Sequence, residues 1–459
     1  ISACLVGSEM CIRDRHYLMV INWDIIKDEC AKIGGELGII SIFRSPSWNK
    51  KIIFPYFVPH DYRHFSNVEE IANSLAPYFN IGKYRFERTL IGCSAWLHDI
   101  GMAVWALGLN DLNIHAGDLL KDLKISALKN FKDNLLKNGL FFKGCINEDN
   151  CSTIDTCSVE SLGIMYVSEK CLNKSNDYRL KLLRFIRMFH PWISEAYVKR
   201  ELPKDIMLIR ELGDRVKYFA SLVGEICKMH DNKVELINRV GTFEGYEVNI
   251  AAYGALLRIA DALDFKRSRV EHLFDGIKYD IINDGFFYEL KHWIFKYAVD
   301  DIDVSGNRIE IKMSDVDESM ILGFLLLEVG NNLAEDYETV NQYRRLPNIV
   351  MILNGKEFVL NKYIGELQDA YGKLKELNTE RLKRYRTELI NIGVNEEQAN
   401  MIFNSINDTN LESLINVPLD ALALALTLNK NAEGLVNLIK KDLPSSVRSY
   451  LNELLRYLL

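Results

Sequence analysis

AWLHDIGMAV, residues 95–104, places His98 and Asp99 side by side within an otherwise apolar run. Two polar side chains of metal-ligating type are costly to bury in such a run unless something satisfies them. Gly101 follows closely and allows another backbone or a ligand to approach. A His-Asp pair alone also occurs by chance in many proteins, so its meaning depends on the rest of the chain.

A second apolar stretch, ALLRIADALDF at residues 255–265, carries Asp261 in a similar setting. Asp264, three residues later, lies on the same face of the expected helix. Upstream, His64 stands in HDYRHFSNVEEIA, residues 60–72, with His60 four residues before it. A single Asp in an amphipathic helix is usually a boundary residue. The combination instead offers the His and carboxylate ligands needed by a metal that activates water.

The order of these residues resembles the HD superfamily of metal-dependent phosphohydrolases, from about residue 55 to 275. The resemblance implies metal ligation by His64, His98, Asp99 and Asp261. Within the superfamily the chain is most similar to bacterial HD-CE type domains, and more distantly to deoxynucleoside triphosphate triphosphohydrolases. Further similarities lie around Glu87, in IRMFHPWIS (186–194), EICKMH (225–230), EHLFDGIKYD (271–280) and ELKHW (289–293).

The resemblance implies hydrolysis of a phosphoester or phosphoanhydride bond in a nucleotide or related phosphorylated compound. The expected cofactor is a divalent metal, one or two ions of Mn, Mg, Fe, Ni or Zn. One alternative is a non-catalytic HD module that binds a nucleotide or metal and signals to a partner protein. Another is an HD nuclease, which the acidic charge balance disfavours.

Other residues are candidates for the same site. We expect catalytic roles for Asp99, His190 and His230, and phosphate contacts from His60, Arg187 and Arg258, because arginine makes bidentate phosphate contacts. Alternatively, the two later histidines are satisfied residues at helix ends. Pro191 suits the first position of a helix, so we expect His190 at a break between two helices. Arg184, Arg267 and Arg269 are either further phosphate contacts or solvent-facing side chains.

A chain of 459 residues is too long for one ordinary core, so we expect two or three domains, and the composition is that of a globular protein. The 459 residues are 48% hydrophobic and 26% charged, with a formal net charge of -7. A mildly acidic chain is a poor non-specific binder of nucleic acid. No stretch approaches the roughly eighteen unbroken apolar residues of a membrane span. We therefore expect a cytoplasmic protein, with a possible homo-oligomeric or protein contact through its last helices.

The fold class expected is mainly α: a helical HD-domain core, a small α+β unit and a C-terminal helical region. Helical periodicity dominates residues 16–275. Residues 276–365 change character, with expected strands at IKYDII (277–282), FFYELKHWIFKYAVD (286–300), DIDV (301–304), NRIEIKM (307–313) and NIVMIL (348–353), interrupted by one helix at 318–340. Residues 366–459 return to helix.

The first fifteen residues, ISACLVGSEMCIRDR, are expected to be a non-native read-through segment. Without them seven cysteines remain, an odd number that favours reduced cytosolic thiols over a disulfide framework. Four of these, Cys145, Cys151, Cys157 and Cys171, form a loose cluster whose spacing matches no usual zinc pattern. We expect thiols in a variable loop there, with a structural metal as the alternative.

Overall fold

The computed structural model describes residues 21–42, 58–103, 109–121, 139–158, 162–236, 238–283, 287–404 and 415–455. The expectation of a non-native segment at residues 1–15 lies outside these ranges. No helix in the part of the chain that the structure describes combines the length and apolarity needed to cross a bilayer.

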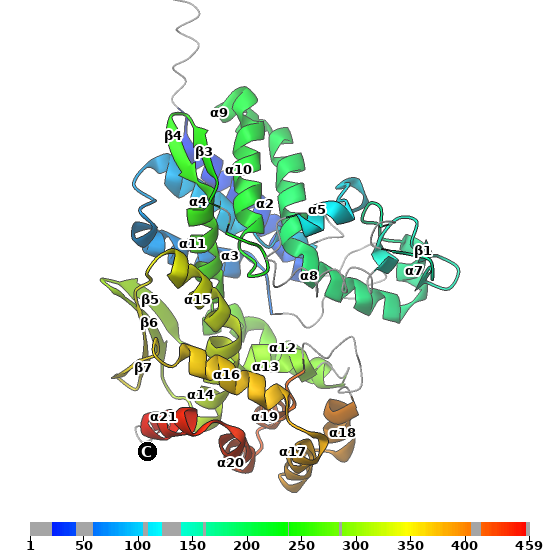
Figure 1. The fold of residues 1–459 in the computed structure, drawn as a ribbon, viewed down its shortest axis with the longest axis vertical. Coiled ribbons are helices and arrows are strands. Elements are labelled where there is room, and N and C mark those ends of the chain that lie inside the picture. Colours follow the sequence, from blue (N-terminus) through cyan, green and yellow to red (C-terminus); the bar gives the residue numbers. More distant parts are fainter. Residues whose placement is uncertain are drawn as a thin grey trace, which may run out of the picture.

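The expectation of a mainly α fold is confirmed (Figure 1). The upper part of Figure 1 holds the helical core, and a four-stranded sheet with its helices lies below it, followed by the last helices of the chain. The core helices are α2 Trp23–Ile42, α3 Tyr62–Leu75, α4 Arg85–Leu97, α8 Asn176–Glu201, α9 Ile206–Leu212, α10 Val216–Lys228 and α11 Ile250–Ala262.

Short elements connect the core helices. The helical ones are η2 Ala76–Phe79, η3 Ile100–Ala103, η4 Leu109–Asp111, α5 Ala116–Leu120, η5 Gly139–Phe141, α7 Glu169–Lys174, η7 Leu202–Lys204, η8 Gly213–Arg215 and η9 Arg267–Arg269. Two antiparallel hairpins pair β1 Ile146–Asn147 with β2 Ser152–Thr153, and β3 Val240–Phe243 with β4 Tyr246–Asn249.

Helix α3 shows how the sequence builds this core. Asp61 caps its start, because the Asp61 carboxylate accepts hydrogen bonds from the backbone N–H groups of Arg63 and His64. Its apolar residues recur at helical spacing and are buried, namely Phe65, Val68, Ile71, Ala72 and Leu75. Helix α3 packs on α4 and α11, the helices beside which the other expected metal ligands lie.

The expected helix break at Pro191 is wrong, because α8 runs without interruption through this residue. Proline has no N–H, so the carbonyl of Arg187, four residues earlier, loses its normal helical partner. The His190 ring replaces that partner, with Nδ1 at 2.8 Å from the Arg187 carbonyl oxygen. This substitute hydrogen bond explains how the helix tolerates the proline.

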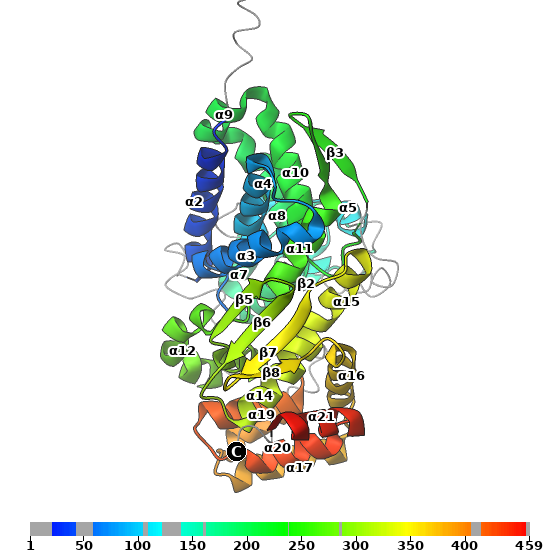
Figure 2. The ribbon, with the colours of Figure 1, turned by 90° about the vertical axis from the view of Figure 1, so that its left-hand side faces the viewer.

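The sheet has the order β5-β6-β7-β8 (Figure 2). Its strands are β5 Asp301–Ser305, β6 Arg308–Met313, β7 Asn348–Leu353 and β8 Lys356–Val359. The outer pairs are antiparallel and β6 runs parallel to β7, with Arg308 opposite Asn348. One long helical connection joins β6 to β7, made of α14 Glu318–Phe324, the π-helix η11 Leu325–Leu333 and α15 Ala334–Tyr343.

Two of the expected strands are helices. Residues 277–282 belong to α12 Glu271–Asn283, and residues 286–300 contain α13 Phe287–Ile294 and η10 Phe295–Ala298. Among the buried residues of the second segment, Phe287, Leu290, Ile294 and Ala298 recur every three or four positions. That helical period outweighs the β-propensity of the individual aromatic and β-branched residues.

The chain ends in α16 Ile364–Lys375, α17 Thr379–Asn391, α18 Glu396–Asn404, α19 Val417–Thr427, α20 Glu433–Asp442 and α21 Ser445–Leu455. Helix α19 packs on α13. Between them Lys291 Nζ and Asp420 Oδ1 form a buried ion pair at 2.9 Å. The boundaries expected at residues 275 and 365 stay predictions.

The expectation of reduced thiols is wrong for six of the seven cysteines considered. Disulfides join Cys30 to Cys93, Cys145 to Cys157, and Cys151 to Cys171, with Cα–Cα distances of 5.1, 5.5 and 5.5 Å. Cys227 is free and buried, which accounts for the odd number. The pairing depends on chain folding rather than on sequence spacing, so counting cysteines missed it. It also leaves the Cys145 cluster without free thiolates for a metal.

Candidate metal centre

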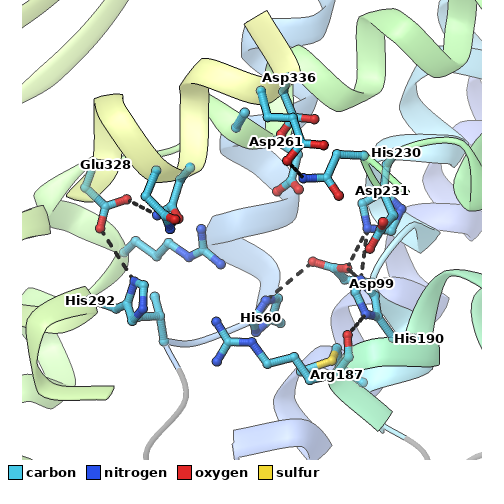
Figure 3. A pocket seen from close by; sticks show the side chains of 18 of the residues that line it. His60, Asp99, Arg187, His190, His230, Asp231, Asp261, His292, Glu328 and Asp336 are labelled. Atoms are coloured by element: carbon cyan, nitrogen blue, oxygen red, sulfur yellow. Dashed lines mark hydrogen bonds and ion pairs between the residues drawn. The ribbon is translucent and has the colours of Figure 1, made fainter. Parts of the chain in front are cut away.

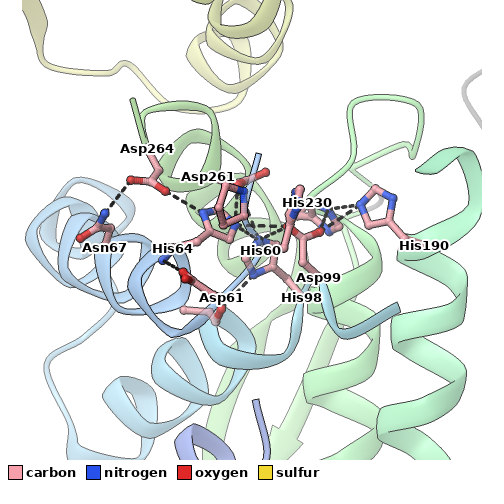
Figure 4. A network of polar contacts seen from close by, with 12 residues as sticks. His60, Asp61, His64, Asn67, His98, Asp99, His190, His230, Asp261 and Asp264 are labelled. Carbon is pink, nitrogen blue, oxygen red and sulfur yellow. Dashed lines mark hydrogen bonds and ion pairs between the residues drawn. The ribbon is translucent and has the colours of Figure 1, made fainter. Parts of the chain in front are cut away.

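Four side chains meet where α3, α4 and α11 converge (Figure 4). His64 lies in the first turns of α3, His98 caps the C-terminal end of α4 with Asp99 directly after it, and Asp261 lies in the last turn of α11. One ligand atom from each lies within 4.8 Å of the others. His64 and His98 are fully buried, so this is an interior group that opens to solvent only beside Asp261.

A second group shares one of these residues. Asp99 also meets His190 of α8 and His230, which follows α10, and these three ligand atoms too lie within 4.8 Å of one another. Asp99 Oδ2 faces His64 and His98, both at 3.2 Å, whereas Asp99 Oδ1 faces His190 at 3.0 Å and His230 at 3.3 Å. The carboxylate of Asp99 therefore stands between two histidine pairs.

The Nδ1 proton of each histidine is fixed by its neighbours. In three rings Nδ1 lies beside the backbone carbonyl three residues earlier: His98 at 2.8 Å from Ala95, His190 at 2.8 Å from Arg187 and His230 at 2.5 Å from Cys227. A carbonyl oxygen only accepts, so each Nδ1 carries a proton and donates it. His64 Nδ1 lies 2.7 Å from the carboxylate of Asp264. In a neutral ring this leaves every Nε2 lone pair directed at the centre.

These lone pairs require positive charge between them. His64 Nε2 lies 3.2 Å from His98 Nε2, and His190 Nε2 lies 3.0 Å from His230 Nε2. Asp99 Oδ1, although buried, accepts no hydrogen bond. Facing lone pairs repel unless a proton or a cation lies between them. Imidazole nitrogens and carboxylate oxygens are usual ligands of divalent transition metals, so the donor set fits such an ion.

The charge distribution agrees with this. Burial lowers the pKa of His98, but the carboxylates of Asp99 and Asp261 outweigh burial and raise it to about 10. Burial raises the pKa of Asp99, yet His98 and His60 hold it well below its usual value. The site therefore attracts positive charge strongly.

Close packing of η3 on α8 brings Asp99 to His190. A Cβ added to Gly101 would lie 2.3 Å from the His190 carbonyl oxygen, closer than real atoms approach. The Gly101 N–H also donates to Ser194 Oγ at 2.9 Å. The expectation that this glycine permits a close backbone approach is confirmed.

The two groups border a cavity of about 420 Å³ (Figure 3). Its lining is mostly polar and comes from the helical core and from the helices beyond it: Val58, His60, Asp99, Met102, Arg187, His190, His230, Asp231, Asn232, Lys233, Asp261, Ala262, Arg269, Glu289, His292, Lys296, Glu328, Asn331, Asn332, Glu335 and Asp336. A cavity of this size is in the range of small-ligand sites.

The structure brings two of the three expected phosphate-binding residues to this cavity. His60 lines it, with Nε2 at 3.5 Å from Asp99 Oδ2, and burial holds the pKa of His60 well below its usual value. Arg187 also lines it and is oriented by two hydrogen bonds to Glu289.

Arg258 is not brought to the cavity. It is fully buried, and its guanidinium donates to the carbonyl oxygens of Met229, Asp231 and Val234. It thus holds the loop that follows α10, the loop that carries His230.

Of the other arginines considered as phosphate contacts, one lines the cavity and two do not. Arg269 lines the cavity and pairs with Asp264 at 3.3 Å. Arg267 pairs with Asp300 at 2.8 Å, and neither it nor Arg184 is among the cavity-lining residues. Glu87 accepts hydrogen bonds from the N–H groups of Lys83 and Tyr84, so it caps α4.

Several residues of the site were missed in the sequence. The sequence indicated only that Asp264 would share a helix face with Asp261. In the structure its carboxylate accepts hydrogen bonds from His64 Nδ1 at 2.7 Å and from Asn67 Nδ2 at 2.9 Å. The polar residues of α13, η11 and α15 were not expected here at all. A Glu and two Asn within the apolar run LLLEVGNNL, residues 325–333, were the available signal.

Comparison with known families adds one match. The model of the family HD-CE matches residues 54–319. Searches of curated proteins and of solved structures found no match. The matched range contains both histidine groups and extends to the start of α14.

Proposed function

The chain belongs to the HD-CE family, and from this premise we propose that it is a metal-dependent phosphohydrolase. Its proposed substrate is a nucleotide or a related phosphorylated compound, and the bond cleaved is a phosphoester or a phosphoanhydride. The proposed cofactor is one or two divalent ions.

One observation carries the proposal: the carboxylate of Asp99 stands between two histidine pairs whose Nε2 lone pairs all point inward. Residues with only a structural role would not bury four facing Nε2 lone pairs that have no donor protons between them. Two neighbouring divalent ions that share a carboxylate are a common arrangement in phosphoester hydrolysis.

In this proposal His64, His98, Asp99 and Asp261 hold one ion, and Asp99, His190 and His230 hold the other. Bound divalent ions would polarise the phosphoryl group and make water a better nucleophile. His60 and Arg187 line the cavity beside Asp99, where their N–H groups can donate to phosphate oxygens. Lys233 and Arg269 add positive charge to the same lining. We leave Arg258 out of this set because its guanidinium holds backbone carbonyls.

The test combines metal analysis with hydrolysis. The full-length protein is stripped with a chelator, reloaded with Mn²⁺, and assayed for phosphate release from a panel of nucleoside mono-, di- and triphosphates. Asp99→Asn removes the shared carboxylate charge at nearly constant volume. We expect it to lower single-turnover hydrolysis more than about 100-fold, since even residues that only orient ligands contribute 10–100-fold.

Asp275→Asn is the matched control, because the Asp275 side chain on α12 is 77% exposed and lies outside the cavity lining. Equal hydrolysis by wild type and Asp99→Asn would refute the proposal. Tight metal and nucleotide binding without hydrolysis by any variant would favour the binding module instead.

A further inference from the structure

The cavity has a second wall that the metal centre does not use. This wall comes from the helical connection between β6 and β7, and it carries Glu328, Asn331, Asn332 and Asp336. Figure 3 shows Glu328 next to His292 at one end of the cavity and Asp336 next to Asp261, with His60 and Arg187 below them. The cavity thus joins the two histidine groups to the carboxylates and amides of this connection.

The polar residues of this wall interrupt an apolar helix. Leu325, Leu327 and Val329 beside them are fully buried. The segment is a π-helix, a rare form that is frequently found at functional sites. It also lies close to α16, because a Cβ on Gly330 would meet the Leu367 carbonyl oxygen at 2.6 Å. The packing therefore holds this wall in place against the C-terminal helices.

The hydrogen bonds within the wall all lead, from donor to acceptor, toward Glu328. Asn331 Nδ2 donates to Asn332 Oδ1 at 2.7 Å, and Asn332 Nδ2 donates to Glu328 Oε2 at 2.9 Å. Lys296 Nζ also donates to Glu328 Oε2, at 3.0 Å. The chain of donors therefore ends at one oxygen of Glu328.

Two buried carboxylate oxygens on this wall accept no hydrogen bond. They are Glu328 Oε1, on a fully buried side chain, and Asp336 Oδ1. His292 Nδ1 lies 3.9 Å from the first and Arg258 Nε lies 3.9 Å from the second, beyond hydrogen-bonding distance. Buried acceptors without donors are unfavourable, and each such case calls for an explanation. A ligand that brings N–H or O–H donors would supply one.

We propose that Glu328, Asn331 and Asp336 bind hydrogen-bond donors on the non-phosphate part of the substrate, and so determine which phosphorylated compound is accepted. The donors are the N–H groups of a nucleobase or the hydroxyl groups of a sugar. This inference rests on the proposed function, which places the phosphate at the Asp99 end. The reverse orientation would set a phosphate against the carboxylates of Asp336 and Glu328.

The test measures binding rather than turnover. Full-length protein in Ca²⁺ is titrated by calorimetry with inorganic phosphate, ribose 5-phosphate and the four common nucleoside 5′-monophosphates. We expect ribose 5-phosphate or at least one nucleotide to bind ten or more times as tightly as inorganic phosphate. A gain already complete with ribose 5-phosphate would assign the donors to sugar hydroxyls, and a gain only with nucleotides would assign them to the base.

Asp336→Asn and Asn331→Ala should each weaken binding of the preferred compound about tenfold, as expected for a lost hydrogen bond to a charged or polar group. The Kd for inorganic phosphate should stay within twofold in both variants. Glu338→Gln is the matched control, because Glu338 is an exposed carboxylate on the same helix and is not among the cavity-lining residues.

Each other outcome overturns the inference in a distinguishable way. If wild type binds inorganic phosphate as tightly as every larger compound, or if both folded variants bind like wild type, the wall does not select substrates. If the variants lose inorganic phosphate as well, these residues act at the metal centre, and the proposed function still stands. If wild type binds neither phosphate nor any nucleotide, the proposed function fails and takes this inference with it.

Discussion

The carboxylate of Asp264 should control how tightly the centre binds a divalent metal. Asp264 Oδ2 accepts the Nδ1 proton of His64 at 2.7 Å, and the residue is almost fully buried. Its partners Asn67 and Arg269, at 2.9 and 3.3 Å, hold the carboxylate in place. Without it, His64 loses the group that fixes its proton and its orientation toward Asp99.

The expected magnitude follows from two independent scales. Losing a residue that orients a metal ligand weakens affinity about 10–100-fold, which corresponds to about 1.4–2.7 kcal/mol. A hydrogen bond to a charged group contributes about 1.5–3 kcal/mol. Asp264→Asn keeps an acceptor oxygen and should lie at the lower end. Asp264→Leu removes the acceptor and should lie at the upper end.

The assay is calorimetric titration of Mn²⁺ into chelator-stripped protein, with melting temperatures measured for each variant. Asp275→Asn, which changes an exposed carboxylate on α12, should leave the affinity unchanged. A purely structural role for Asp264 would lower the melting temperature without changing the affinity of the folded protein. Mn²⁺ affinity within twofold of wild type in folded Asp264→Leu would refute the reasoning.

Three further predictions concern stability. Gly101→Ala should cost about 1–3 kcal/mol in urea unfolding, because its Cβ would lie 2.3 Å from the His190 carbonyl, whereas Gly117→Ala meets no atom within 4 Å and should be tolerated. Arg258→Ala should cost about 3 kcal/mol or more, since three carbonyl oxygens lose their donor. The folded pKa of His98 is about 10 against 6.5 in the unfolded chain. The bound proton therefore stabilises the fold fully below pH 6.5, and this stabilisation is lost as the pH rises through 10. Metal-stripped protein should have a lower melting temperature at pH 10 than near pH 7. Bound Mn²⁺ should reduce this difference in melting temperature.

The sequence was most informative where side-chain chemistry and helical period coincide. His98, Asp99 and Asp261 stand in apolar runs, where a polar residue needs a compensating partner, so their likeness to a metal centre was visible without coordinates. The structure brings these residues and His64 together. Helical periodicity likewise indicated α3, α4, α10 and α11, whose apolar residues are mostly buried.

The partners of these residues were not visible, because they are set by contacts between distant parts of the chain. Asp264 was expected on one helix face with Asp261, but α11 ends at Ala262, and the partner of Asp264, His64, is 200 residues away. Arg258 looked like a phosphate ligand because arginine suits phosphate, and only the folded loop shows three carbonyls at its guanidinium. Short windows also misled, since six residues at 277–282 cannot distinguish a strand from part of a helix.

The three histidines bonded to carbonyls nevertheless share a feature that is readable in a sequence. Each binds a carbonyl that the normal helical pattern leaves without its N–H partner. His98 caps the end of α4, His230 follows the end of α10, and the last carbonyls of a helix lack intrahelical partners. His190 lies inside α8, but Pro191 withdraws the N–H from the Arg187 carbonyl.

A missing backbone hydrogen bond of the helical pattern is therefore what fixes the Nδ1 proton and turns Nε2 toward the centre. In this light the proline after His190 supports the candidate metal centre, because it frees the acceptor that orients the ring. The same reasoning explains why position 101 requires glycine. The substitute hydrogen bond keeps α8 continuous at His190, and η3 packs against that turn of the helix, where the His190 carbonyl would meet any side chain at position 101. Helix ends, a proline and a glycine thus position the ligands that the apolar runs bring into the core.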